Sequence, residues 1–412
     1  MLNVDNYYYN TGENIFLWDA LIRKNRFAVR CRPTTLGGQS IKSNEKRHMK
    51  RRDFVSGLAL AAGATACSRQ QADCGPTDTP SRETFEWNIV TSWPPGLPGL
   101  GVGVEHLAER IEKATNGRLK IKVFAGGELV PALEVLDAVS LGTVQMGHDS
   151  AYYHRGKVPA AQYFTTIPFG QTVHEINAWI YYGGGLELWR ELYEPFNVIP
   201  FPAGNTGVQM AGWFNKEINT VDDLKGLKMR IPGMGGEVMQ RAGATQVTVP
   251  ASEIFTALQT GAIDAAEWVG PYNDLSLGLH KAARYYYYPG WHETSPMLQC
   301  TINLDAWKSL PGDIQEIVAN VCQAINLDIM AEYTWGNAMA LEQMKKDPNI
   351  EIRRLPDDVL ALLKRLSREA IEELSAKDEW GARIQASFDA FQRISVPNQR
   401  ISELAYMNAR EL

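Results

Sequence analysis

The chain has 412 residues, of which 45% are hydrophobic, enough for two or three folded units with a sizeable core. The formal charge is −6, but residues 1–66 carry eleven Lys/Arg and five Asp/Glu, so the remaining residues have 30 against 42 and a net charge of −12. An acidic body argues against nucleic acid as the partner.

Residues 1–48 show no sustained periodicity, and Met49 stands directly before a basic run. We predict that this segment is either upstream sequence translated in error, with Met49 as the biological start, or a disordered basic extension.

Residues 49–67 have the layout of an export signal. A basic run that includes Arg51 and Arg52 precedes the moderately apolar stretch Phe54–Ala66, which ends at Cys67. Paired arginines followed by phenylalanine resemble a twin-arginine signal, and the apolar stretch is too short to remain as a spanning helix. The sequence around Cys67 predicts either lipid attachment there or ordinary cleavage. The polar segment 68–84 is predicted to be a linker, and the body is predicted to work outside the cytoplasm.

Strand and helix patterns alternate from Phe85 onward. The spacing predicts strands over 85–91, 119–124 and 144–148, with helices over 103–115 and 130–140. Because a strand–helix–strand series requires parallel pairing with helices on the sheet faces, the fold is predicted to be α/β.

A second series of the same kind follows, and then a helical region. The second series comprises helices 175–182, 186–194, 236–242 and 251–260, and strands 198–203, 227–231 and 246–248. After a strand near 298–303, helices are predicted over 305–309, 311–345, 357–375 and 378–394. The helix at 311–345 has one apolar face over several turns, so it can pack across two lobes or against another chain.

Glu267 lies in an unusual setting for a charge. Its neighbours in the stretch Gly261–Tyr272 are Ala, Trp, Val and Gly, so its desolvation is costly unless a cation or an arginine lies nearby. Arg230 ends a predicted strand, and its planar donor fork matches a carboxylate. The alternative for Arg230 is an ordinary surface ion pair.

Further polar side chains predict a cation site. Asn205 and Gln209 share one face of an extended segment, and Glu293 lies in a Gly- and Trp-rich loop. Two carboxylates, an amide and a backbone carbonyl form an oxygen-only environment, which suits sodium, calcium or magnesium and not zinc or copper.

No motif in the sequence supports an enzyme. There is no Gly-x-Ser-x-Gly elbow, no His-Glu-x-x-His, no phosphate-binding Gly-Lys-Ser/Thr loop, and no Gly-x-Gly-x-x-Gly between a strand and a helix. The histidines are scattered, so His148, His154, His174 and His292 are each expected to be structural. The five cysteines include no Cys-x-x-Cys pair, and Cys300 and Cys322 fit either a disulfide or two buried thiols.

The longer stretches around these residues resemble the extracytoplasmic solute receptors of tripartite ATP-independent periplasmic (TRAP) transporters. The resemblance is to the subgroup that binds 2-oxo and 2-hydroxy monocarboxylates with a cation. It runs from about Phe85 to the C-terminus and rests on Gly126–Pro131, Gly204–Trp213, Leu227–Arg230, Asp264–Tyr272 and Tyr285–Trp291.

The resemblance implies a two-lobed α/β periplasmic binding protein that closes on its ligand, with long C-terminal helices. Residues 85–204, completed by about 266–300, would form lobe I. Residues 205–265, completed by about 301–345, would form lobe II. In relatives the long C-terminal helix joins two chains, which implies a homodimer with a contact at 311–345 or in 346–412.

The resemblance also implies a role for each site residue. Arg230 would bind the ligand carboxylate, Asn205 would donate a hydrogen bond to the ligand, and Tyr152, Tyr153 and Trp268 would line the cleft. The cation ligands would be Gln209, Glu267, the Trp268 carbonyl and Glu293. His292 stands where a relative can carry an aromatic side chain.

The sequence therefore predicts an exported, non-catalytic receptor. It would capture a pyruvate- or lactate-like acid with sodium or calcium and deliver it to a TRAP membrane permease. The alternatives are a metal-dependent periplasmic enzyme acting on such acids and a ligand-sensing partner of a sensor kinase.

Overall fold

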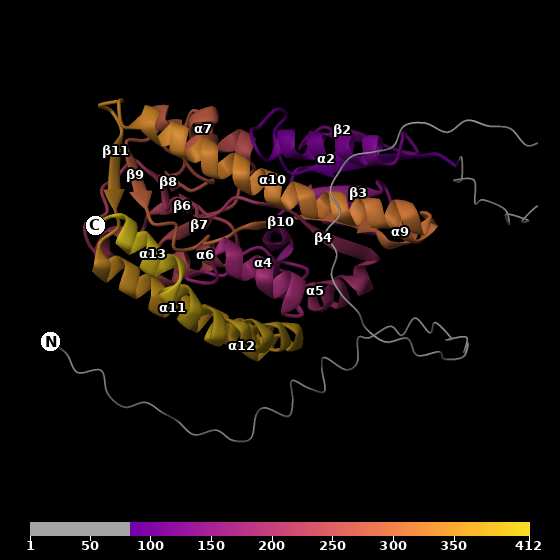
Figure 1. Cartoon of the computed structure of the whole chain (residues 1–412). Helices are drawn as coiled ribbons and strands as arrows, with labels where there is room; N and C mark the ends of the chain where they lie inside the picture. The colour runs from indigo at the N-terminus through magenta and orange to yellow at the C-terminus, as the bar shows by residue number, and fades with distance from the viewer. Residues whose placement is uncertain (1–82) are drawn as a thin grey trace, which may run out of the picture. The chain divides into compact units, whose positions relative to one another are not determined.

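The computed structural model describes residues 83–412. The predicted segments 1–48 and 49–67, with Cys67, and the linker up to residue 82 lie outside the described residues. The described chain forms two β-sheets with helices packed on them (Figure 1). None of the helices within 83–412 has both the length and the apolar character needed to cross a membrane.

The first sheet has the strand order β2-β1-β3-β10-β4. Its strands are β1 (Phe85–Thr91), β2 (Leu119–Phe124), β3 (Met146–Asp149), β4 (Val198–Asn205) and β10 (Met297–Asn303). The predicted parallel pairing is confirmed for β1 with β2 and with β3. The later strand β10 pairs antiparallel with both β3 and β4, which makes the sheet mixed.

The second sheet has the order β11-β9-β5-β8-β6-β7. Its strands are β5 (Gly212–Phe214), β6 (Lys228–Arg230), β7 (Thr245–Val247), β8 (Ala265–Ala266), β9 (Tyr285–Tyr288) and β11 (Glu351–Arg354). The expectation that 266–300 completes the first lobe is therefore wrong for most of that segment. Backbone pairing of β8 with β6 and of β9 with β5 places both strands in the second sheet, and within 266–300 only the start of β10 joins the first.

The helices of the first sheet region lie close to their predicted places. They are α2 (Gly101–Ala114), α3 (Val135–Ser140), α4 (Val173–Tyr182), α5 (Gly185–Tyr193) and α9 (Leu304–Ser309). Helix α3 begins five residues later than the sequence predicts. The preceding residues form turns in which Gly127 has a φ of +89° and the Glu134 amide donates to the Pro131 carbonyl, so helical geometry starts only after them.

The helices that follow the second sheet's strands are α6 (Gly233–Arg241), α7 (Ala251–Gln259) and α8 (Pro271–Ser276). The long helix α10 (Gly312–Met344) packs on β4 and α2 on one side of the protein and on α8 next to the second sheet. Gly336 permits the close approach to α8, since a Cβ there would lie 2.6 Å from the Tyr272 ring. Of the two predicted roles, packing across both lobes is the one that the structure shows.

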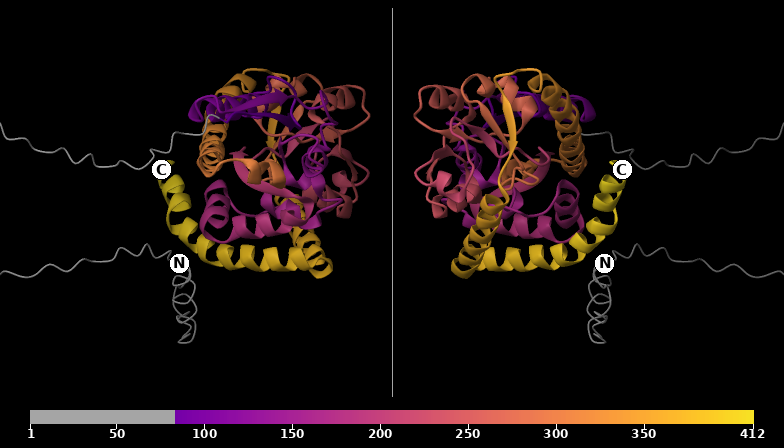
Figure 2. Two further views of the ribbon diagram at one scale, coloured as in Figure 1. Left: turned by 90° about the vertical axis from the view of Figure 1, so that its right-hand side faces the viewer. Right: turned by 90° about the vertical axis from the view of Figure 1, so that its left-hand side faces the viewer.

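The C-terminal helices form a second connection between the two sheet regions. Helix α11 (Asp357–Lys377) packs on α6, and α12 (Glu379–Ile401) packs on α4 and α5. Helix α12 runs seven residues beyond its predicted end, through Pro397, and leads into α13 (Glu403–Arg410). In Figure 2, α11 and α12 run along the lower edge of the protein, and α10 lies above them.

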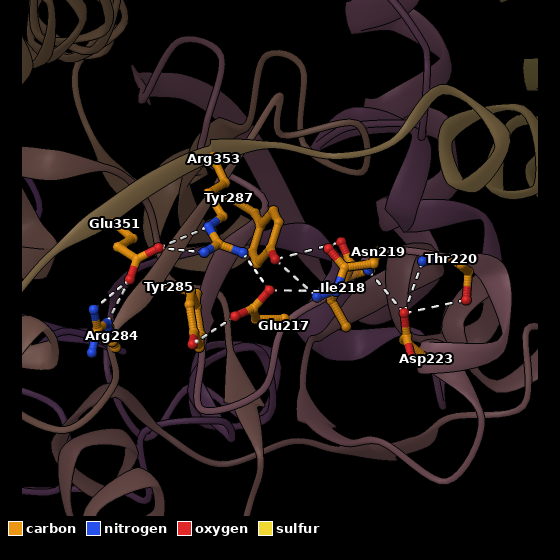
Figure 3. A network of polar contacts seen from close by, with 10 residues as sticks. All are labelled: Glu217, Ile218, Asn219, Thr220, Asp223, Arg284, Tyr285, Tyr287, Glu351 and Arg353. Carbon is orange, nitrogen blue, oxygen red and sulfur yellow. Dashed lines mark hydrogen bonds and ion pairs between the residues drawn. The ribbon is translucent and has the colours of Figure 1, made fainter.

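An exposed polar network holds the edge strand β11 to its neighbours (Figure 3). Arg353 pairs with Glu217 and with Glu351, and the Arg284 Nε donates to Glu351 at 2.7 Å. The Tyr285 hydroxyl donates to Glu217 at 3.1 Å. The network therefore ties β11 and β9 to the loop that follows β5.

Candidate functional site

Four segments that are distant in sequence meet where the two sheets approach each other. Backbone hydrogen bonds join them: the Gln209 amide donates to the Glu293 carbonyl at 3.0 Å, and the Met210 amide donates to the Val269 carbonyl at 3.0 Å. The Glu267 amide donates to the Arg230 carbonyl at 3.1 Å. These bonds fix the predicted site residues on a rigid backbone frame.

Arg230 and Glu267 form a buried ion pair. Their exposed fractions are 1% and 0%, and the Arg230 Nη1 donates to the Glu267 carboxylate and, at 2.9 Å, to the Glu267 carbonyl. The predicted positive partner of Glu267 is thus an arginine, and the surface alternative for Arg230 is wrong. Burial opposes the Arg230 charge, but Glu267 together with Tyr153, Tyr152 and Glu293 outweighs it, so the pKa of the guanidinium is raised. The Nη2 is buried and has no hydrogen-bond partner among the described residues.

Glu293 brings a second buried carboxylate to the same place. It is 2% exposed, and a ligand atom of Glu293 lies within 4.8 Å of ligand atoms of Glu267 and His292. Burial and the charge of Glu267 raise the pKa of Glu293 well above its usual value. Its Oε2 has no partner within residues 83–412. Two buried carboxylates this close cannot both be charged at low cost unless a cation lies between them.

His292 is a site residue that the sequence analysis missed. Its Nε2 lies 3.2 Å from the Glu267 Oε2, so this histidine is not isolated from the carboxylates, and its structural role stays a prediction. Its place directly before Glu293 is the signal that could have revealed it. His148, by contrast, is structural as expected: the Trp93 Nε1 donates to its Nδ1 at 2.8 Å, and its Nε2 donates to the Ala203 carbonyl at 2.9 Å.

The two predicted amides differ in what they leave free. Both polar atoms of Asn205 contact the backbone, since its Nδ2 donates to the Ser295 carbonyl at 3.1 Å and its Oδ1 accepts from the Gly207 amide at 2.8 Å. The Gln209 Nε2 donates to the Thr206 Oγ1 at 3.2 Å, but its Oε1 is buried and lacks a partner in the described part of the chain. The structure thus leaves Gln209, and not Asn205, with an unused acceptor.

Aromatic rings enclose a small cavity beside these groups. Tyr152, Tyr153, Trp268 and Trp93 line it together with Gln209, and its volume is about 10 Å³, near the minimum for one water molecule. The Arg230 guanidinium lies 5.1 Å from the Trp268 ring centre. Burial raises the pKa of Tyr153 to about 12. The predicted cleft residues are therefore gathered in a closed, aromatic-walled site.

Asp274 supports this site from behind, and no local sequence signal points to it. It accepts hydrogen bonds from the Tyr286 hydroxyl at 2.7 Å, the Trp213 Nε1 at 3.0 Å and the Val269 amide at 3.3 Å. Its pKa is raised to about 7 by burial. Asp274 thus fixes the backbone directly after Trp268.

A larger cavity of about 740 Å³ lies between α11, α12 and the loop at residues 167–170. It contains none of the predicted site residues and does not adjoin the buried carboxylates. We therefore assign the candidate site by its chemistry to the smaller cavity.

The two Cys candidates for a disulfide, Cys300 in β10 and Cys322 in α10, are both buried free thiols. Of the two alternatives that the sequence left open, the structure shows the second.

Comparison with known proteins identifies the family of the chain. The model of the family "Bacterial extracellular solute-binding protein, family 7" matches residues 90–378. The chain is 44% identical, over 364 residues, to a monocarboxylate 2-oxoacid-binding periplasmic protein of Nostoc sp. (strain PCC 7120); the match covers 87% of this chain and 98% of that protein.

Two solved structures are similar over most of the described chain. A TRAP periplasmic solute binding protein from Pseudoalteromonas atlantica T6c, with bound sodium and pyruvate, is 40% identical with a TM-score of 0.77, covering 79% of this chain and 99% of that one. A TRAP transporter solute binding protein from Bordetella bronchiseptica RB50 is 38% identical with a TM-score of 0.78, covering 80% and 97%. It is a mixed occupancy dimer with copurified calcium and picolinate in one active site and an apo second site. The chain described here belongs to family 7 of the bacterial extracellular solute-binding proteins.

Proposed function

We propose that this protein is an extracytoplasmic receptor of a TRAP transporter. It binds a small 2-oxo or 2-hydroxy monocarboxylate, similar to pyruvate or lactate, together with a metal cation, and delivers the acid to a membrane permease. The observation that carries the proposal is a set of buried polar atoms with no partner within residues 83–412: the Arg230 Nη2, the Gln209 Oε1 and the Glu293 Oε2. One donor and two acceptors without partners are costly in a protein interior unless a ligand uses them.

The cation ligands in this proposal are Gln209, Glu267, the Trp268 carbonyl and Glu293. Their oxygen atoms suit sodium or calcium, which take carboxylate, amide and carbonyl oxygens. When bound, the cation supplies positive charge to the carboxylate and the 2-oxygen of the acid. Its charge would also offset the burial and the repulsion from Glu267 that together raise the pKa of Glu293.

The remaining residues recognise the organic part of the ligand. Arg230 offers its free Nη2 to the carboxylate of the acid, and Tyr152 and Tyr153 enclose the short carbon chain. Asn205 holds the loop at Ser295 with one N–H of its Nδ2, and the second N–H is the donor that it would offer to the ligand. A cavity of about 10 Å³ does not admit pyruvate, so ligand entry requires the two sheet regions to separate.

Calorimetric titration tests this function. The full chain is stripped with chelator and titrated with pyruvate, lactate and longer 2-oxo acids, with and without sodium or calcium. We expect tight binding that one of the cations restores. Failure of every monocarboxylate to bind in the presence of both cations would overturn the proposal.

The receptor is proposed to be non-catalytic. No side chain of the site is assigned a catalytic role in this proposal: Glu267 is paired with Arg230, Glu293 is assigned to the cation, and His292 contacts Glu267. Incubation with pyruvate or lactate, with calcium present, should return the acid unchanged by NMR, and any turnover would instead support the metal-dependent enzyme.

A homodimer through the C-terminal helices is proposed as its assembly. Apolar side chains on α12 and α13 are exposed, among them Ile401, Leu404, Tyr406 and Met407. Exposed apolar patches of this kind mark interaction surfaces. Light scattering should give a dimer for the full chain and a monomer for Leu404→Asp combined with Met407→Asp; a dimer in the double variant would exclude this contact.

The export route is proposed from the N-terminal sequence. The segment 49–67 would direct twin-arginine export to the periplasm, and Cys67 would carry a lipid anchor. Loss of export after replacement of Arg51 and Arg52 by lysine, and release from membranes after Cys67→Ala, would test the two statements separately.

A further inference from the structure

We propose that His292 is a third side-chain ligand of the cation site, so that the site binds borderline divalent cations such as Ni²⁺ and Zn²⁺ as well as calcium. The inference rests on the proposed function, because it concerns the same cation. It adds a nitrogen ligand to a site that the sequence predicts to be oxygen-only.

The three side chains lie close enough together to share one ion. One ligand atom from each of Glu267, His292 and Glu293 lies within 4.8 Å of the other two, and all three residues are at least nine-tenths buried. Three donors this close can reach one ion with small side-chain movements. The imidazole faces Glu267, the residue with which it would share the ion.

Hydrogen bonding gives the His292 ring no other fixed role. Its contact with the Glu267 Oε2 is long, at 3.2 Å, and its Nδ1 has no partner among the described residues. His148 is the contrast, since both of its ring nitrogens are engaged by hydrogen bonds of 2.8 and 2.9 Å. A buried imidazole that is bound this weakly keeps a nitrogen lone pair available for a metal.

Packing also confines the His292 ring to the site. The His292 Cβ lies against α6, where a Cβ added to Gly235 would be only 2.8 Å away, and the Trp291 ring packs edge-on at 5.3 Å. His292 is 1% exposed. The ring therefore cannot swing into solvent, and any larger residue at Gly235 would displace it.

The chemistry then decides which ions benefit. Calcium and sodium take oxygen ligands and gain little from imidazole, whereas nickel and zinc bind imidazole well. With His292, the donor set becomes two carboxylates, one imidazole, the Gln209 amide oxygen and the Trp268 carbonyl. Affinity should rise from Mn²⁺ through Co²⁺ to Ni²⁺, the order that N/O/S sites generally follow, and the part of the rise that the imidazole adds should depend on His292.

The test compares the full chain with the His292→Gln variant, because a glutamine amide can still donate to Glu267 but has no imidazole lone pair. Chelator-stripped protein is titrated calorimetrically with Ca²⁺, Mn²⁺, Co²⁺, Ni²⁺ or Zn²⁺, without any organic acid. We expect His292→Gln to weaken Ni²⁺ and Zn²⁺ binding by roughly tenfold or more and to change Ca²⁺ binding by less than about threefold. The matched control is His106→Asn with His174→Asn, which removes two exposed histidines and should leave Ni²⁺ binding unchanged.

Unchanged Ni²⁺ affinity in His292→Gln, or an equal loss for Ca²⁺ and Ni²⁺, overturns the inference, because the second result indicates a purely structural histidine. Should the variant not fold, the Co²⁺-loaded unaltered protein decides. A paramagnetically shifted, exchangeable imidazole proton that persists in the His106/His174 control supports coordination by His292, and its absence refutes it. Calcium-dependent pyruvate binding in the same samples keeps the two proposals apart: if it is present while nickel binding does not depend on His292, only the inference fails.

Discussion

The same ion-pair chemistry occurs in two environments in this protein. Arg230 and Glu267 are paired at 1% and 0% side-chain exposure, whereas Arg353 and Glu217 are paired at 32% and 41%. Around Arg353, water completes the hydration of each charge, and the network simply holds strand β11 at its edge (Figure 3). Around Arg230, the protein itself must satisfy every polar atom, and one donor of the guanidinium is left over.

Burial decides whether an unused donor indicates a ligand site. An unused donor at an exposed arginine carries no information, because water occupies it. An unused donor at a buried arginine, beside buried acceptors that are also unused, indicates a ligand of matching charge. The predictions below test this contrast, beginning with the largest expected effect.

Replacement of Glu267 by Gln should have the largest effect on the free energy of unfolding. It removes the carboxylate that is paired directly with the buried Arg230, and breaking a buried pair costs about 3–5 kcal/mol of the free energy of unfolding. Urea denaturation without ligand measures this effect, and Glu217→Gln in the exposed network is the matched control. A loss for Glu267→Gln no larger than that of the control would show that burial does not distinguish the two pairs.

Asp274 is a buried carboxylate that has no cationic partner among the described residues. Its pKa in the folded state is about 7, against an ordinary value of 3.8. Between these values the folded state binds more protons than the unfolded state, so the free energy of unfolding falls as pH rises from about 4 to about 7. We expect Asp274 to contribute a decrease of about 2 kcal/mol between pH 5 and pH 7.

Urea denaturation of Asp274→Asn over this pH range checks the Asp274 contribution. The variant should lose most of the decrease relative to the unaltered protein, whatever its stability at pH 5. An identical pH dependence in both proteins would show that Asp274 titrates near its ordinary value.

Arg230→Lys should weaken binding of the organic acid. Lysine keeps the positive charge beside Glu267 but lacks the second arm of the guanidinium, which is the free donor. Pyruvate affinity with calcium present should fall by tenfold or more, about 1.4 kcal/mol. Calorimetric titration measures it, and unchanged affinity would remove Arg230 from the ligand contacts.

Arg353→Gln should give the smallest effect. The Arg353 side chain is partly hydrated, so its ion pairs are weak and are screened by salt. We expect a small decrease of the urea midpoint at low ionic strength that disappears in high salt. A salt-independent loss comparable to that of Glu267→Gln would contradict the distinction between the two environments.

The order of the elements and the donor types of the site follow from local sequence patterns. Periodic apolar residues specify helices such as α10 and alternation specifies strands such as β1, because these patterns report local geometry. The apolar neighbours of Glu267 required a positive partner, and the structure supplies Arg230. Both inferences depend on residues that are close in sequence.

Local sequence patterns do not specify how distant segments pair, so this pairing is seen only in the folded chain. The antiparallel entry of β10 and the transfer of β8 and β9 to the second sheet follow from strand registers over long sequence separations. The contact of His292 with Glu267 and the three hydrogen bonds to Asp274 likewise join residues whose local patterns carry no signal for one another. Which polar atoms stay unpaired is decided last, because it depends on every neighbour that packing brings within hydrogen-bond distance.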